Sequence, residues 1–575
     1  MILFHMKDPT SFAHVRSFEG QMCCTYREAC LRRGLLEDEG LWNTALQEAS
    51  ECRTPEAMRR IFCLIFLFSN VSNLLHLWDT FKDSFSEDHL RQLQAEDSTA
   101  GFDFNNVIYN TALLDLQSRL QAMGGVGVLR FQFAISTVIN SNEGQLFFLD
   151  APGRTGKTFL MNLLLAKILQ ENRIAIAVAS SGIAATLLHG SRTAHSPFKL
   201  PLDLTKQGNP TCNVSRGSAM GNLLTECSLI IWDEAAMCHK AAFEALERSL
   251  QDLRRNMRVM GGVIVLLSGN FRQTLPVIPW GTRADEVNAS IKSSYLWHHS
   301  EKLHLSTNMR VHVFGDENAA TFSAQLLDVS NGTVAGDTDS FIHLPFGNFV
   351  PTKDDLISAV FLDIASQNLH KTCLQGIAIL APHNKTVDAI NNKLFDLLPG
   401  EKLSFKSIDT HENPDDMTVV TTEFLNSQMP TGLPPHELHL NDGAPIMLLL
   451  KLDAPIMCNG TRMIIKNIYS RVLQATILNG PATGQDVLIT PMSLTPSDTI
   501  YKFKRLQFPI KLSFAMTINK VQGQSLQMVC LNLTEQVFSH GQLFLGCSHL
   551  GSTQSLDICA SEGKTRNMAY KEALH

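Results

Sequence analysis

The pattern of apolar positions divides the chain into a helical first part and a longer part in which strands alternate with helices. Apolar residues recur three and four positions apart in residues 25–36, 41–50 and 55–68, which predicts amphipathic helices in an N-terminal region, residues 1–118. Beyond about residue 125 the apolar residues form short continuous runs, at 145–150, 174–180, 228–232 and 263–269. Strands that are apolar on both faces and separated by helices predict a parallel sheet with helices on both sides.

A second strand–loop–helix group begins at residue 375, and the same kind of pattern returns at 508–533. The chain between 400 and 500 is instead rich in turns, and its short strands predict a small inserted β-barrel. We therefore expect an α/β protein with two nucleotide-binding-type domains, the second of them interrupted. The expected bounds are 119–310 for the first domain, 311–400 for a linker and the start of the second, 401–500 for the insertion, and 501–575 for the remainder.

Composition and charge narrow the class of protein. A chain of 575 residues with 44% hydrophobic and 18% charged residues is globular and too long for one hydrophobic core. The net charge of −7 gives no basic field over the whole chain, so a nucleic-acid partner would have to bind in a local groove. The 13 cysteines contain no C-x-x-C pair, and the most apolar run, at 61–68, is too short for a membrane helix. We expect an intracellular protein without a membrane segment.

Residues 150–160, DAPGRTGKTFL, lie between a predicted strand and a predicted helix, as a phosphate-binding loop does. In such a loop, backbone N–H groups and the helix N-terminus meet phosphate oxygens. Lys157 is expected to reach the β- and γ-phosphates, and the Thr158 hydroxyl to ligate Mg²⁺. The residues expected to contact the nucleotide here are Pro152, Gly153, Arg154, Thr155, Gly156, Lys157 and Thr158.

Two later strand ends supply the groups that hydrolysis of a nucleoside triphosphate needs. The strand in SLIIWDEAAM ends at Asp233, which can hold Mg²⁺ through water, and at Glu234, which can polarise an attacking water. The strand in VIVLLSGNFRQTLPVIP is followed by Gln273, which can sense the γ-phosphate. Each piece alone has an ordinary alternative, such as a solvated turn or a fortuitous loop. Their order along the chain favours an NTPase core.

Several stretches resemble, in order, the motifs of the Pif-type (petite integration frequency) DNA helicases, and more narrowly the helicase portion encoded by Helitron transposons. They are ASSGIAATLLHGSRTAHSPFKLP, SGNFRQTLPVIP, LHLSTNMR, SFAMTINKVQGQSL and FSHGQLFLGCSHLGS. Segments near the N-terminus and the final RNMAYKEAL also resemble these proteins, so the likeness covers nearly the whole chain. It implies two RecA-like domains, ATP and Mg²⁺ in the cleft between them, and translocation on single-stranded DNA from five-prime to three-prime.

The resemblance also implies roles for individual residues. Gln132 would read the adenine, Arg310 would be an arginine finger, and Gly523 would lie beside the nucleotide. Lys157, Asp233, Glu234 and Gln273 would take the roles given above. The residues expected along single-stranded DNA are His195, Ser196, Phe198, Lys520, Gln522 and Gln524. Each of these has an alternative: Phe198 as a core residue, His195 as a loop cap, and Lys520 as a solvated charge.

Four positions depart from the family pattern. Ala151 and Arg154 stand where the family has glycines, Asn270 where it has aspartate, and His549 where its last motif has arginine. If residue 154 needs a positive φ, a side chain there costs about 1–2 kcal/mol. Neutral imidazole cannot replace a bidentate guanidinium, and finger arginines contribute roughly 10³–10⁵ in rate.

Three functions are consistent with these residues. The first is an ATP-dependent DNA helicase acting on single-stranded and duplex DNA. The second is a catalytically impaired, transposon-derived protein that binds ATP and DNA, and the third is a P-loop ATPase of another kind, against which the second-domain motifs argue. A nuclear or otherwise intracellular location, and roles in repair, recombination, telomere maintenance or transposition, are suggested by the family alone.

Overall fold

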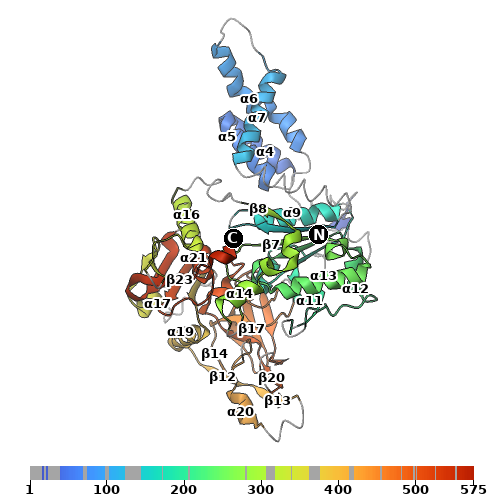
Figure 1. The fold of residues 1–575 in the computed structure, drawn as a ribbon. Helices are drawn as coiled ribbons and strands as arrows, with labels where there is room; N and C mark the ends of the chain where they lie inside the picture. The colour runs from blue at the N-terminus through green and yellow to red at the C-terminus, as the bar shows by residue number, and fades with distance from the viewer. Residues whose placement is uncertain are drawn as a thin grey trace. The chain divides into compact units, whose positions relative to one another are not determined.

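The computed structural model of the chain falls into two compact units, Met1–Arg130 and Phe131–His575. We describe each unit by itself (Figure 1). The described residues are 16–18, 21–23, 39–52, 54–68, 74–96, 103–122, 144–153, 155–170, 172–201, 203–204, 208–278, 281–305, 317–337, 340–361, 376–412, 420–430, 432–453, 456–480, 482–496, 499, 501–524, 526–550 and 553–574. None of the helices within these ranges is long and apolar enough to cross a membrane.

The first unit is a bundle of helices, as the periodicity predicts. Its elements are a short hairpin of β1 (Ser17–Phe18) and β2 (Gln21–Met22), then α4 (Glu39–Cys52), α5 (Pro55–Phe68), α6 (Leu74–Glu96) and α7 (Asn106–Ala122). Arg59 on α5 is buried and forms ion pairs with Asp88 on α6 and Asp115 on α7, both at 2.6 Å. One guanidinium therefore links three helices of the bundle.

Domain 1 is a parallel six-stranded sheet in the order β5-β4-β6-β7-β3-β8. The strands are β3 (Leu146–Asp150), β4 (Ala175–Ala179), β5 (Arg192–Thr193), β6 (Leu229–Asp233), β7 (Ile264–Gly269) and β8 (Ser300–His304). Its helices include α9 (Lys157–Gln170), α10 (Gly182–Thr186), α11 (His195–Phe198), α12 (Ala219–Glu226), α13 (Lys240–Arg254) and α14 (Arg283–Ala289). The four apolar runs thus form the buried centre of the sheet.

Domain 2 contains a second parallel sheet, in the order β10-β24-β23-β11-β22. Its strands are β10 (Asn348–Phe349), β11 (Ile377–Ala381), β22 (Ala515–Thr517), β23 (Met528–Leu533) and β24 (Leu556–Ala560). Its helices are α16 (Glu317–Asn331), α17 (Lys353–Phe361), α19 (Asn384–Leu397) and α21 (Gln542–Ser548), and β9 (Phe341–His343) pairs with β25 (Lys564–Arg566). Two parallel sheets flanked by helices agree with the predicted fold class.

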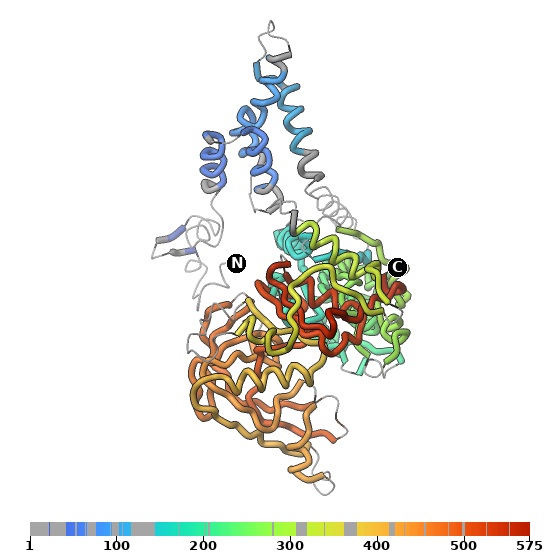
Figure 2. Tube along the Cα trace, turned by 90° about the vertical axis from the view of Figure 1, so that its left-hand side faces the viewer, coloured from blue at the N-terminus to red at the C-terminus, as the bar shows by residue number. Residues whose placement is uncertain are grey.

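The insertion between β11 and β22 consists of small antiparallel sheets, drawn in yellow and orange in Figure 2. Its elements are β12 (Leu403–Lys406), β13 (Ile408–His411), α20 (Thr422–Ser427), β14 (Glu437–Leu440), β15 (Pro445–Leu448), β16 (Arg462–Ile468), β17 (Leu473–Ile477), β18 (Asp486–Ile489), β19 (Met492–Leu494), β20 (Phe503–Gln507) and β21 (Ile510–Leu512). A fully buried ion pair between Arg505 and Asp409, 2.6 Å apart, joins β20 to β13.

The structure differs from three of the expected boundaries. Helix α7 continues past residue 118 to Ala122, and the first unit ends at Arg130. The insertion does not end at 500, because β20 and β21 still pair within its sheets. The end of the chain, expected to complete domain 2, packs instead into domain 1: Tyr570 and Ala573 are buried in the same core as Phe271 and Leu275.

Candidate active site

The phosphate loop begins where β3 leaves the centre of the domain 1 sheet. The Ala151 N–H donates to the carbonyl of Gly269 at 3.1 Å, and the Thr155 hydroxyl donates to the carbonyl of Pro152 at 2.8 Å. Gly156 has φ +84°, a backbone conformation that favours glycine, and α9 starts directly after it at Lys157. The loop therefore presents the N-terminus of a 14-residue helix, as a phosphate site requires. Arg154 lies outside the described residues.

Lys157 reaches the two carboxylates that follow β6. Its Nζ lies 2.8 Å from Asp233 Oδ1 and 3.0 Å from Glu234 Oε1, and all three side chains are largely buried. Burial disfavours the charged ammonium, but the two carboxylates outweigh it and hold the pKa of Lys157 above its usual value. Burial raises the pKa of Asp233, and the Lys157 charge offsets this only in part. Glu234 has φ +54°, a strained conformation for a side-chain-bearing residue and one that is common at functional sites.

The loop after β7 meets domain 2 at this point. Gln522, in the loop after β22, donates through Nε2 to Glu234 Oε2 at 2.6 Å and to Gln273 Oε1 at 3.0 Å. Arg272 Nε donates to Asn331 Oδ1 of α16 at 3.1 Å. The sequence-based assignment of Gln522 to the DNA track is therefore corrected, because its buried amide bridges the carboxylate and the sensor glutamine between the two domains.

Asn270 and His549, two of the positions that depart from the family pattern, also lie near these residues. Asn270 is buried; its Oδ1 accepts from the Arg272 N–H at 3.0 Å, and its Nδ2 has no hydrogen-bond partner among the described residues. His549 Nδ1 donates to the carbonyl of Gln524 at 2.8 Å. This bond holds the ring against the loop that carries Gln522. Gln132 and Arg310, expected at the adenine and as a finger, lie outside the described residues.

The residues expected along DNA separate into two groups. His195 and Ser196 are exposed on α11, and Lys451 of the insertion donates to the Ser196 hydroxyl at 3.3 Å. Phe198 is fully buried, with its ring 5.5 Å from that of Trp232. It is a core residue and cannot stack on a base, which corrects the prediction. An apolar aromatic residue at this position is consistent both with a place in the core and with stacking on a base.

The loop around Gly523 also faces domain 1. Gly523 has φ +85°, and a Cβ there would lie 3.1 Å from the Ala184 N of α10. Gln524 is nearly buried and donates to the Lys520 carbonyl at 3.3 Å. Desolvation, together with the charge of Lys511, lowers the pKa of Lys520, so two ammonium groups lie near each other here.

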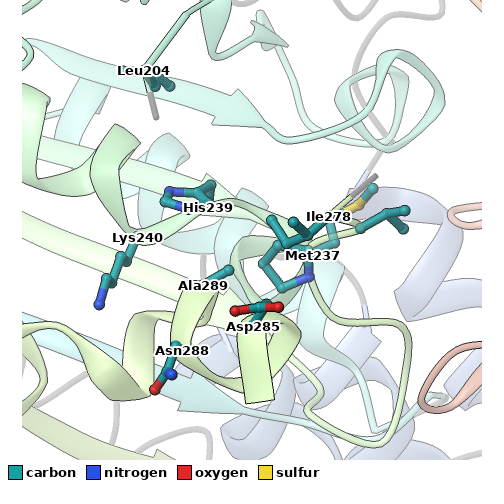
Figure 3. A pocket seen from close by; sticks show the side chains of 10 residues that line it. Leu204, Met237, His239, Lys240, Ile278, Asp285, Asn288 and Ala289 are labelled. Carbon is teal, nitrogen blue, oxygen red and sulfur yellow. The ribbon is translucent and has the colours of Figure 1, made fainter. Parts of the chain in front are cut away.

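Sequence reasoning missed an open pocket of about 590 Å³ on domain 1 (Figure 3). It lies among the segments that follow α11, β6 and β7, and its lining is Leu204, Met237, His239, Lys240, Pro276, Val277, Ile278, Asp285, Asn288 and Ala289. Figure 3 shows Met237 and Ile278 together on one side, and His239 and Lys240 on another. The apolar run PVIP, which follows Gln273 in the sequence, could have indicated this pocket, because apolar residues are unusual in a loop after a strand.

Residues 130–340 match the model of the PIF1-like helicase family, and residues 423–468 match the 2B domain of DNA helicase Pif1. Over these residues the chain is similar to the PIF1-like helicase family. A relative from Xenopus laevis, named ATP-dependent DNA helicase PIF1, is 24% identical over 470 residues, covering 78% of this chain and 64% of its own length. The chain thus spans less than two thirds of that relative.

Two solved structures share the fold of this protein. The Pif1 helicase from Candida albicans superposes with a TM-score of 0.55 at 20% identity, covering 77% of this chain and 96% of that one. The Pif1 helicase from Bacteroides in complex with ADP-AlF3 and ssDNA gives a TM-score of 0.53 at 19% identity, over 74% and 91% of the two chains. The match to the 2B domain, residues 423–468, covers the part of the insertion from α20 to β16, within the region predicted as a barrel.

Proposed function

We propose that this PIF1-like chain is an ATP-dependent DNA helicase, which couples ATP hydrolysis to five-prime to three-prime translocation on single-stranded DNA and to duplex unwinding. The observation that carries the proposal is the bridge formed by Gln522 of domain 2 between Glu234 and Gln273 of domain 1. The carboxylate proposed to activate water and the glutamine proposed to sense the phosphate are thus both bound by a residue of domain 2. Changes at the phosphate would therefore move one domain against the other.

In the proposed cycle, ATP takes Lys157 away from Asp233 and Glu234. The triphosphate offers the ammonium a stronger partner, and the released Glu234 is then placed to polarise water. Arg310, outside the described residues, keeps its proposed role as a finger on the transferred phosphoryl group. Gln132 likewise keeps its proposed contact with adenine.

Mg²⁺ would be held by the Thr158 hydroxyl and, through water, by Asp233. Both are oxygen donors, which Mg²⁺ prefers, and a bound Mg²⁺ would neutralise charge that develops on the β- and γ-phosphates. Burial has raised the pKa of Asp233, so a divalent cation is also a favourable partner for that carboxylate once Lys157 has left. The donor set therefore fits the ion.

For DNA, we propose a track over α11 and the loop after β22. Exposed His195 and Ser196 lie beside Lys451, and Lys520 lies near Lys511, so cations are available to phosphates without a basic net charge. The pocket with Met237 and Ile278 on one side offers a place for a base. None of these groups reads sequence, as a translocating protein requires.

The test is an ATPase assay with and without single-stranded DNA, on the parent and on Lys157→Ala. We expect DNA-stimulated hydrolysis that falls by roughly 10²-fold or more in Lys157→Ala, because the group that binds the phosphates is lost. Lys167→Ala, ten residues along the same helix α9, is the matched control and should keep the parent rate. Absence of hydrolysis in the parent with DNA present would overturn the proposal.

A second function is favoured by His549 and Asn270: a catalytically impaired protein that binds ATP and DNA. The His549 ring is committed to the Gln524 carbonyl, and no guanidinium stands at that position. This alternative predicts nucleotide binding without turnover in the parent, and turnover in the double variant His549→Arg with Arg154→Gly. It is wrong if the parent already hydrolyses ATP and the double variant is no faster. The Helitron origin and a nuclear location stay predictions from the resemblance.

A further inference from the structure

We propose that the end of the chain, residues 567–574, is a strap that ties domain 2 to domain 1 and positions the Gln273 loop in the cleft. This inference rests on the proposed function for its consequence, but its contacts belong to the chain itself. The segment is NMAYKEAL, whose role the sequence left open. Figures 1 and 2 both place the C-terminus beside segments of domain 1.

The strap leaves domain 2 through hydrogen bonds with the backbone of that domain. Asn567 Nδ2 donates to the carbonyl of Val329 in α16 at 2.8 Å, and its N–H donates to the carbonyl of Ser340 at 2.9 Å. One residue later, the Met568 carbonyl accepts from the Gly541 N–H at 3.1 Å, just before α21. These bonds fix the first half of the strap to the domain that carries Gln522.

The second half belongs to domain 1. Tyr570 and Ala573 are 4% and 3% exposed within the domain 1 core, and α22 (Lys571–Leu574) is the final helical turn. Lys292 Nζ donates to the carbonyls of Ala573 and Leu574 at 2.9 and 3.0 Å, at the end of a helix where a cation is favourable. The same Nζ lies 4.4 Å from the ring of Phe271.

Arg283 gives the strap a second attachment to domain 1. Its guanidinium lies over the Tyr570 ring at 4.6 Å and pairs with Glu572. The Arg283–Glu572 pair is about half exposed on both sides, so it contributes little by itself. The buried contacts of Tyr570 and the two carbonyl bonds of Lys292 therefore carry the attachment.

His540 links the strap to the Gln273 loop. The ring is fully buried; its Nδ1 accepts from the Tyr570 N–H at 2.8 Å, and its Nε2 donates to the Phe271 carbonyl at 2.7 Å. Because Nδ1 accepts a hydrogen bond and Nε2 donates one, the ring is neutral and carries its proton on Nε2. Next to it, Gly541 has φ +68°, and a Cβ there would lie 2.4 Å from the Arg272 carbonyl oxygen. Domain 2 thus contacts the backbone of Phe271 and Arg272, the two residues that precede Gln273.

This geometry has a mechanical consequence. The strap and His540 hold the Gln273 loop to domain 2 even when no phosphate is bound, so the cleft can open only by rotation around this attachment. His540 and Lys292 are positioning residues: they contact the loop and strap, and Gln273 and Glu234 carry the chemistry. Loosening the strap should therefore leave the phosphate loop intact while Gln273 loses its fixed distance from Gln522.

Hydrogen exchange of the nucleotide-free full-length chain tests the strap without any need for activity. Asparagine at position 540 can keep the acceptor for Tyr570 but not the donor to Phe271, whereas glutamine can keep the donor. We expect peptides covering 268–276 to exchange about tenfold faster in His540→Asn, as the loss of one buried hydrogen bond implies, and clearly less so in His540→Gln. Lys292→Met should accelerate the same peptides, while Lys302→Met, a lysine near Trp297 that does not touch the strap, should not.

Unchanged exchange of these peptides in both His540→Asn and Lys292→Met would overturn the strap. In the ATPase assay, the same two variants should lower the ratio of DNA-stimulated to basal hydrolysis by several-fold, with the KM for ATP nearly unchanged. If the parent shows no hydrolysis, the proposed function fails while the exchange result still decides on the strap. Faster exchange with an unaltered stimulation ratio would overturn the positioning role.

Discussion

Lys157 shows how one residue can serve two states of a cleft. Without nucleotide it is buried against Asp233 and Glu234, and the two carboxylates keep it charged despite burial. Burying this charge with its partners costs far less than burying the same charge alone. The ammonium therefore keeps its charge without nucleotide, and the proposed function has a triphosphate replace the carboxylates as its partner.

His549 is the residue where the chain and its family differ most in chemistry. We predict that His549→Arg raises kcat for ATP by at least about tenfold, because a guanidinium can stabilise charge on the transferred phosphoryl group and imidazole cannot. Steady-state ATPase measurements with saturating single-stranded DNA check this. His549→Lys, which restores charge without the bidentate geometry, is the control and should recover less. An unchanged kcat in His549→Arg would show that the position has no part in turnover.

At the scale of elements, one guanidinium joins three helices of the N-terminal bundle. We predict that Arg59→Met lowers the free energy of unfolding of the bundle by about 3 kcal/mol, because Asp88 and Asp115 lose their buried partner. Urea unfolding of the N-terminal unit, monitored by limited proteolysis, measures this free energy of unfolding. Arg60→Met, the exposed neighbour on α5, should change the stability by less than about 0.5 kcal/mol. Equal effects of the two substitutions would contradict this account.

The attachment at His540 should depend on pH. Burial lowers the pKa of His540, the charges of Arg283 and Lys292 lower it further, and its bond to the Phe271 carbonyl opposes them. The folded-state pKa is thus below the unfolded value of about 6.5, so the stabilisation is present above about pH 6.5 and is lost as the pH falls below it. Burial raises the pKa of nearby Glu286, and it raises the pKa of Tyr570 to about 12, so Tyr570 adds no charge in this range.

We therefore predict a free energy of unfolding that declines between about pH 7 and pH 5 in the parent, with a smaller decline in His540→Gln. Urea titrations at several pH values give the two curves. Protonated His540 would turn its Nδ1 toward the Tyr570 N–H as a second donor, which is the physical cause of the decline. Parallel curves for the parent and the variant would show that His540 is not the source of this pH dependence.

The fold and the centre of the site could be predicted where the signal is local. The runs at 145–150 and 228–232 became β3 and β6, and α9 begins at Lys157, because continuous apolar strands and a glycine loop have few alternatives. Contacts between distant segments could not be predicted. Nothing local in KVQGQS places Gln522 on Glu234, and nothing local in NMAYKEAL shows that Tyr570 enters the core of domain 1. Phe198 was misplaced for the same reason, since an apolar side chain suits both a core and a base.

At the scale of the whole molecule, the proposed reaction is shared by two domains that each contain a parallel sheet flanked by helices. Domain 1 contributes the phosphate loop, the two carboxylates and Gln273, while domain 2 contributes Gln522 and, through His540, a grip on the sensor loop. The insertion adds Lys451 beside the exposed end of α11. Function therefore depends on the relation between domains within the second unit more than on any one motif.

The central claim is that the loop at Lys157 still accepts a triphosphate. Isothermal titration of the full-length chain with magnesium and a non-hydrolysable ATP analogue tests it most directly. The account predicts one binding site per chain, with an affinity at least about tenfold weaker in Lys157→Ala. No heat of binding from the folded parent protein would contradict it.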